Sequence, residues 1–100
     1  MLERDIEKYL VKEIRVRGGR AYKFVSPGNN GVPDRVVCLP NGKTVFVELK
    51  TDTGRLSEIQ KVQIRKLTDM RQETRVVYGI GGVKDFLREV DQWLDTQKSE

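Results

Sequence analysis

The sequence of 100 residues contains no histidine and a single cysteine, Cys38. Without histidine, the chain can build neither a Ser-His-Asp triad, nor a Cys-His pair, nor a metal site with imidazole ligands. One cysteine excludes an intramolecular disulfide framework and a zinc finger. Because Cys38 lies in an apolar run, we expect it to be a small buried side chain. Carboxylates, amides and basic side chains are left to carry any chemistry.

Long apolar segments are also missing. No stretch approaches the roughly 20 apolar residues of a membrane span, and no signal-peptide pattern opens the chain. We therefore expect a soluble, cytoplasmic protein with no membrane partner. The 19 Lys and Arg outnumber the 15 Asp and Glu, for a net charge of +4. This balance favours nucleic acid as a partner, although many ordinary domains are equally basic.

Hydrophobic periodicity predicts one α/β domain over residues 1–100, with residues 96–100 as a solvated tail. The expected order is α-β-β-β-α-β-α, a mixed sheet flanked by helices. Helices are predicted at residues 2–16, 57–71 and from 83 onward, and strands at 21–25, 34–39, 43–50 and 74–78. In the second helix, the apolar side chains are expected to point mostly inward: Ile59, Val62, Ile64 and Leu67.

The loop Pro40-Asn41-Gly42 determines the register of the central hairpin. Gly42 suits the left-handed position of a three-residue loop, which would pair Leu39 with Lys43. Counting outward from that pair, Asp34 lies opposite Glu48. A two-residue loop would move Asp34 to the other face, so we favour the three-residue loop.

The segment Glu48-Leu49-Lys50 ends a strand that is apolar on both faces. Glu48 and Lys50 share one face by strand alternation, and the hairpin brings Asp34 to them. Two neighbouring carboxylates without His or Cys suit a hard cation, Mg²⁺ or Mn²⁺. A metal beside a lysine is suited to hydrolysis of phosphodiesters. The spacing alone equally allows a strand start at Asp34 and a surface ion pair between Glu48 and Lys50.

Three motifs together resemble the VRR-type nucleases of the PD-(D/E)xK superfamily: residues 31–35 (Gly-Val-Pro-Asp-Arg), Glu48-Leu49-Lys50, and Leu56-Ser57 with Gln60. The resemblance extends over nearly the whole chain. It implies a restriction-endonuclease-like core, which matches the element order above. It further implies a Mg²⁺- or Mn²⁺-dependent endonuclease of phage or bacterial type, a homodimer that cleaves four-way (Holliday) DNA junctions.

The resemblance also assigns roles to individual residues. Asp34, Glu48 and the Leu49 carbonyl would hold the metal, and Lys50 would assist the water, supported by Glu3 and Gln60. Glu3 has a second interpretation, as an acid favoured at a helix N-terminus, and Glu7 is the next choice for its role. Gln60 can also form a capping box with Ser57, and its two roles are compatible.

Four basic residues are candidates for DNA contact: Lys23, Arg35, Lys61 and Arg65. Each also has an ordinary interpretation as a solvated or structural charge. Arg35 in particular should point away from Asp34 by strand alternation. The segment Gly79-Ile80-Gly81-Gly82 lacks the Lys-Ser/Thr of a P-loop, so we interpret it as a strand-to-helix turn and expect no nucleotide cofactor.

Three rival functions remain compatible with the sequence. The first is a catalytically silent DNA-binding module, which would have no need for Asp34, Glu48 and Lys50 together. The second is a nuclease that acts on flaps or single strands instead of junctions. The third is a subunit that is active only with other proteins.

Overall fold

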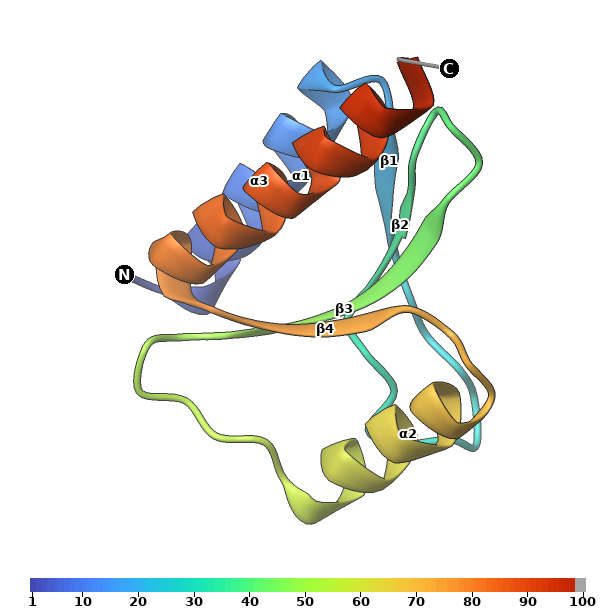
Figure 1. Cartoon of the computed structure of the whole chain (residues 1–100). Coiled ribbons are helices and arrows are strands. Elements are labelled where there is room, and N and C mark those ends of the chain that lie inside the picture. Colours follow the sequence, from blue (N-terminus) through green and yellow to red (C-terminus); the bar gives the residue numbers. More distant parts are fainter. Residues whose placement is uncertain (99–100) are drawn as a thin grey trace.

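The computed structural model describes residues 1–98, with side chains described up to residue 95. Two helices cover one side of a four-stranded sheet and a third helix lies on the other side (Figure 1). The elements follow the predicted order: α1 (Glu3–Val16), β1 (Arg20–Lys23), β2 (Arg35–Cys38), β3 (Thr44–Lys50), α2 (Glu58–Asp69), β4 (Thr74–Tyr78) and α3 (Gly79–Lys98). The predicted α/β fold class is confirmed.

The strand order is β1-β2-β3-β4, so β3 is central, as its apolar faces predicted. The first three strands are antiparallel, and β4 runs parallel to β3 because α2 carries the chain back across the sheet. The hairpin has the predicted register, since Cys38 pairs with Thr44 and the Leu39 amide donates to the Lys43 carbonyl at 2.9 Å. Gly42 has a φ of 91°, the left-handed conformation that the three-residue loop requires.

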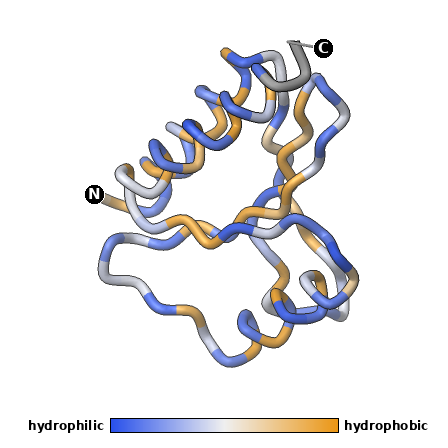
Figure 2. The backbone as a smooth tube through the Cα atoms, in the orientation of Figure 1, coloured by the Kyte–Doolittle hydropathy of each residue, from blue (hydrophilic) through white to orange (hydrophobic). Residues whose placement is uncertain are grey.

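The hydrophobic core lies between the sheet and the two helices α1 and α3. Each of these helices presents an apolar stripe to the strands. Hydrophobic segments, coloured orange, recur along both helices in Figure 2. The core consists of completely or almost completely buried apolar side chains: Ile6, Leu10 and Ile14 from α1; Val37, Val45, Val47, Leu49 and Val77 from the strands; and Val83, Phe86, Leu87 and Val90 from α3. This layer anchors the strand that carries Glu48.

The opposite layer is much thinner, and here one prediction was wrong. No residue of α2 is buried, and Ile59 and Val62 are 47% and 45% exposed instead of pointing inward. Ile64 and Leu67 are half-buried. The periodicity located the helix correctly. However, α2 lies over only the edge of the four-stranded sheet, so the sheet does not cover the whole apolar side of the helix.

The start of the last helix differs most from the sequence-based boundaries, and β1 ends at Lys23 instead of residue 25. Helix α3 already begins at Gly79, so the predicted turn Gly79-Ile80-Gly81-Gly82 is its first turn. Gly79 has a φ of 66°, which lets the chain pass from β4 into the helix without an intervening loop. The expected tail at residues 96–100 lies outside the residues whose side chains are described. None of the helices described is long and apolar enough to cross a membrane.

Candidate active site

The hairpin between β2 and β3 brings two carboxylates to the same face of the sheet. Asp34 directly precedes β2, and the register that pairs Arg35 with Val47 extends to Asp34 opposite Glu48. Asp34 Oδ2 accepts a hydrogen bond from the Leu49 amide at 2.9 Å. The predicted meeting of Asp34 and Glu48 is confirmed, and their common face is the one that α2 partly covers.

Glu48 is the one buried charged residue among those described, with 2% of its surface exposed. Gln60 Nε2 donates to Glu48 Oε2 at 3.0 Å, and the Lys50 ammonium lies 3.6 Å from the same oxygen. The other oxygen, Oε1, is buried and has no hydrogen-bond partner within the described part of the chain. A buried, unpartnered carboxylate oxygen is costly, so this oxygen requires either a proton or a cation.

The protonation of Glu48 reflects these surroundings. Burial raises the pKa of its carboxyl from 4.5 to about 7, and the neighbouring Asp34 carboxylate acts in the same direction. The Lys50 ammonium opposes both effects. Near neutral pH, a small change in nearby positive charge therefore decides whether Glu48 is ionised.

Lys50 is the last residue of β3 and its side chain is only 18% exposed. Strand alternation puts it on the face of Glu48, while Leu49 between them is completely buried in the core. The burial of Leu49 holds the two flanking charged residues in place. The Glu48-Leu49-Lys50 segment therefore has the geometry predicted from its alternation.

Gln60 forms the predicted capping box and also contacts Glu48. The side-chain Oε1 of Gln60 accepts from the backbone amide of Ser57 at 2.9 Å, and the backbone amide of Gln60 donates to Ser57 Oγ at 3.2 Å. The two hydrogen bonds together form a capping box. Gln60 Nε2 remains free to donate to Glu48. The cap thus orients the side chain that contacts the buried carboxylate.

Glu3 is not brought into contact with this centre. It is exposed at the start of α1, and it forms no hydrogen bond or ion pair that the structure describes. Its charge is nevertheless the smallest of the contributions that raise the pKa of Glu48, so it lies within electrostatic range. Glu7, the second choice for this role, forms an ion pair with Arg35 at 2.9 Å instead.

The four candidate DNA contacts lie in two places, one on β1 and β2 and one on α2, the helix whose Gln60 contacts Glu48. Lys23 and Arg35 pair with each other across β1 and β2, and they share the face of Val47, opposite to Glu48. Lys23 is exposed, whereas Arg35 is half-buried and also donates to the Ala21 carbonyl at 3.1 Å. Lys61 and Arg65 are exposed on α2, where Lys61 is 3.2 Å from Glu58.

The glycine-rich loop before Asp34 has a structural role that the sequence did not reveal. Gly31 has a φ of 86°, and a Cβ at this position would lie 2.9 Å from the carbonyl carbon of Ile59. The loop therefore packs directly on the first turn of α2, and Pro33 at its end is completely buried. This contact connects the strand start at Asp34 with the helix that carries Gln60. The combination of glycine with a following proline was its only signal in the sequence.

The carboxylates of Asp34 and Glu48 fit a hard divalent cation that takes only a few of its ligands from the protein. Within the described residues, no group of three or more His, Cys, Asp or Glu side chains is arranged to hold a metal ion. Mg²⁺, however, is usually held by only one or two carboxylates and keeps several waters. Asp34 and Glu48, with the unpartnered Oε1 of Glu48, meet that requirement.

Comparisons with known proteins find related sequences. The VRR-NUC domain family matches residues 5–80. The chain is 69% identical over 48 residues to "Putative nuclease p44" of Acyrthosiphon pisum secondary endosymbiont phage 1, a match that covers 48% of this chain. The same match covers 52% of the phage protein, so the chain spans about half the length of that curated relative.

Solved structures carry the same fold. One, named "VRR_NUC domain", has a TM-score of 0.81 and 25% identity, and the match covers 86% of this chain and 94% of that one. A second, "VRR_NUC domain protein", has a TM-score of 0.65 at 17% identity over 89% of this chain and 87% of that one, and supports the fold alone. The family match covers most of the sequence, including every residue of the carboxylate centre. The chain therefore belongs to the VRR-NUC domain family.

Proposed function

We propose that this protein is a Mg²⁺- or Mn²⁺-dependent endonuclease that hydrolyses phosphodiester bonds in DNA. The observation that carries the proposal is the buried Glu48 carboxylate, which has one unpartnered oxygen and lies beside Asp34 and Lys50. A structural ion pair would have both oxygens satisfied or exposed to water. A carboxylate kept buried and incompletely bonded is typical of a cation site.

Each residue of the centre has a distinct task in this mechanism. Asp34 and Glu48 would hold the cation, together with the Leu49 carbonyl, and the bound cation would supply Lewis-acid polarisation of the phosphate and an acidified water. Gln60 orients the Glu48 carboxylate through its 3.0 Å hydrogen bond. Lys50 supplies a positive charge that orients the attacking water and stabilises the negative charge developing on the phosphate oxygens.

For the substrate we propose branched DNA, in particular a four-way junction, cut by a homodimer. A domain of 100 residues has little surface to spare for reading bases, which suits recognition of DNA shape through phosphate contacts. Resolution of a junction needs two symmetric cuts, and a two-fold dimer supplies two equivalent centres. Flaps and single strands are the alternative substrates within the same chemistry.

A catalytically silent DNA-binding module is the rival from another class. The net charge of +4 is compatible with it. The buried Glu48 argues against it, because a pure binder would gain nothing from a desolvated carboxylate facing a phosphate backbone. A subunit that needs other proteins for activity would have the same centre but would be inactive alone.

The test is cleavage of a labelled four-way junction, a flap and a matched linear duplex in Mg²⁺ and in Mn²⁺, by the wild type and by Lys50→Ala. We expect the wild type to cut the junction best and the variant to bind it but to cut at least about a hundredfold more slowly. Lys84→Ala, which removes an exposed lysine on α3, is the matched control and should cut normally.

Binding without cleavage by the wild type, in every metal and on every DNA, would contradict the nuclease and favour the binding module. If a cell extract restored cleavage in that experiment, the protein would be a subunit of a larger enzyme. Equal cleavage of flap and junction would contradict the junction preference and leave the hydrolytic chemistry intact.

A further inference from the structure

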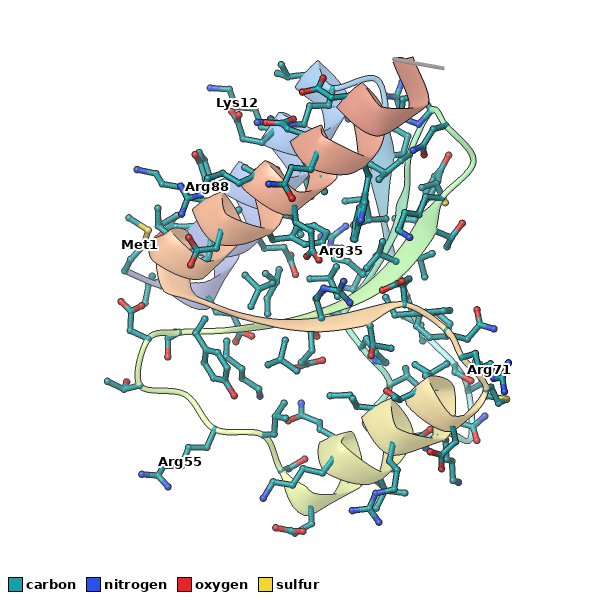
Figure 3. The ribbon with its side chains drawn as sticks, viewed as in Figure 1. Met1, Lys12, Arg35, Arg55, Arg71 and Arg88 are labelled. Atoms are coloured by element: carbon teal, nitrogen blue, oxygen red, sulfur yellow. The ribbon has the colours of Figure 1, made fainter. Side chains whose placement is uncertain are left out.

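A groove of about 510 Å³ lies along the outer side of α1, on the opposite side of the sheet from the carboxylate centre. One turn after another of α1 contributes to it, and its inner wall is formed by Arg35 of β2. Lys12 projects outward from the helix, whereas Arg35 lies between the helices and the sheet (Figure 3). The groove is lined by Glu7, Lys8, Val11, Lys12, Arg15, Val16 and Arg35.

The charge of this groove is strongly one-sided. Lys8, Lys12 and Arg15 recur at helical spacing, are all exposed, and form no ion pair with any residue whose side chain is described. The one carboxylate of the groove, Glu7, is engaged by Arg35 at 2.9 Å. Three uncompensated cations therefore line one wall, and like charges at i and i+4 destabilise a helix slightly unless an anion lies between them.

Arg35 connects the groove to the carboxylate centre. It follows Asp34 directly in the chain, so its backbone is one residue away from that carboxylate. Its Nε is buried and has no acceptor among the described residues, although the rest of the guanidinium bonds to Glu7 and to the Ala21 carbonyl. The groove thus runs from the backbone of the catalytic hairpin outward along α1.

We propose that this groove holds the phosphate backbone of a duplex arm that flanks the cleaved bond. The proposal rests on the proposed function, since it names how the same enzyme grips its DNA substrate. Charge complementarity selects this occupant: the exposed Lys8, Lys12 and Arg15 on one helix fit a polyanion without sequence readout. None of these three cations lies on the face of the sheet that carries Glu48 and Lys50.

The dimensions of the basic stripe suit a short stretch of backbone. From Lys8 to Arg15 the helix rises about 10 Å, at about 1.5 Å per residue. Each strand of a DNA duplex advances about 3.4 Å per nucleotide along the duplex axis. The length of the stripe therefore corresponds to the axial rise of about three nucleotides.

The experiment measures DNA binding in EDTA, so that no cleavage interferes, by fluorescence anisotropy at several salt concentrations. The variant Lys8→Ala/Lys12→Ala/Arg15→Ala removes the stripe. Each lost phosphate contact lowers the slope of log K against log[salt] by about 0.9, so we expect a slope reduced by 2 to 3 and affinity roughly tenfold weaker or more. Because the three side chains are exposed, the melting temperature should hardly change.

Two control variants test whether DNA binding depends on the charges of the groove and on their location. Lys8→Arg/Lys12→Arg/Arg15→Lys keeps every charge and should bind with the wild-type slope. Lys84→Ala removes one exposed charge from α3 and should lower the slope less than Lys12→Ala does. A DNA substrate whose flanking duplex arm is shortened to fewer than three base pairs should bind wild type and triple variant equally weakly.

If the triple variant has an unchanged salt slope while the wild type cleaves DNA, DNA binding in the groove is contradicted and the proposed nuclease function is not. A triple variant that binds DNA normally but changes the oligomeric state in analytical ultracentrifugation would assign the groove to a second copy or an acidic protein partner instead. If the wild type neither binds nor cuts any DNA, the proposed function itself fails and the inference fails with it.

Discussion

The two faces of the sheet differ in how completely they are covered. Toward α1 and α3, the strand residues Val37, Val45 and Val47 are completely buried. Toward α2, the corresponding apolar residues Val36 and Phe46 are only half-buried, and the one fully buried strand residue is Glu48. The first face stabilises the fold, and on the second only Lys50, at the end of the central strand, is partly exposed, with 18% of its side chain accessible. A small domain can carry a costly buried carboxylate because the opposite face supplies the stability.

The largest expected effect is on the open face, which is the side of the sheet toward α2 that carries Glu48. Asp34→Asn should keep the hydrogen bond with the Leu49 amide, because the asparagine oxygen can accept it, but removes the charge beside Glu48. We expect cleavage to fall roughly a hundredfold to a thousandfold with the melting temperature nearly unchanged. Single-turnover kinetics and thermal unfolding measure the two quantities. Asp69→Asn, an exposed residue at the end of α2, is the control, and equal losses in both variants would contradict the assignment.

The covered face, which is the side of the sheet toward α1 and α3, should instead respond through the free energy of unfolding. Leu10→Ala on α1 opens a cavity at a completely buried position and should lower the free energy of unfolding by about 2–5 kcal/mol. Leu67→Ala makes the same chemical change on half-buried α2 and should cost about 1 kcal/mol. Urea denaturation of both variants tests the comparison. Similar losses would mean that α2 contributes as much to stability as α1 does.

The pH dependence of stability should reveal the buried carboxylate of the open face. Because the pKa of Glu48 is raised from 4.5 to about 7, the folded state holds a proton between these values that the unfolded state has lost. Stability in EDTA should therefore fall as pH rises from 4.5 to 7 and change little from this source above that. Glu48→Gln should remove this slope. Glu58→Gln, at a position 91% exposed, should keep it, and a wild type with no such slope would contradict the raised pKa.

The smallest expected effect separates the two roles of Gln60. Ser57→Ala and Gln60→Ala both break the capping box and should each cost about 1 kcal/mol of stability. Only Gln60→Ala also removes the donor to Glu48, so it alone should slow cleavage, by roughly tenfold. Parallel melting curves and cleavage rates decide this. An equal loss of rate in both variants would mean that Gln60 acts on the site only by stabilising α2.

The sequence determined the features that depend on neighbouring residues. Helical and strand periods located all seven elements, and the turn chemistry of Pro40-Asn41-Gly42 predicted the register that brings Asp34 to Glu48. Short loops leave few alternative pairings, and alternation then decides the face of every side chain on the strand. The capping box of Ser57 and Gln60 could be predicted for the same reason, since both residues lie within one helical turn.

Only the tertiary structure decided what lies across from what over long sequence distances. It paired Arg35 with Glu7, packed Gly31 on Ile59, left Ile59 exposed, and kept Glu3 out of direct contact with Glu48. These outcomes depend on the angle at which each helix crosses the sheet and on how much of a face one helix can cover. A helical period predicts which side of a helix is apolar, but not how wide a surface that side packs against. The thin layer of α2 and the basic groove along α1 therefore appear only once the elements are packed.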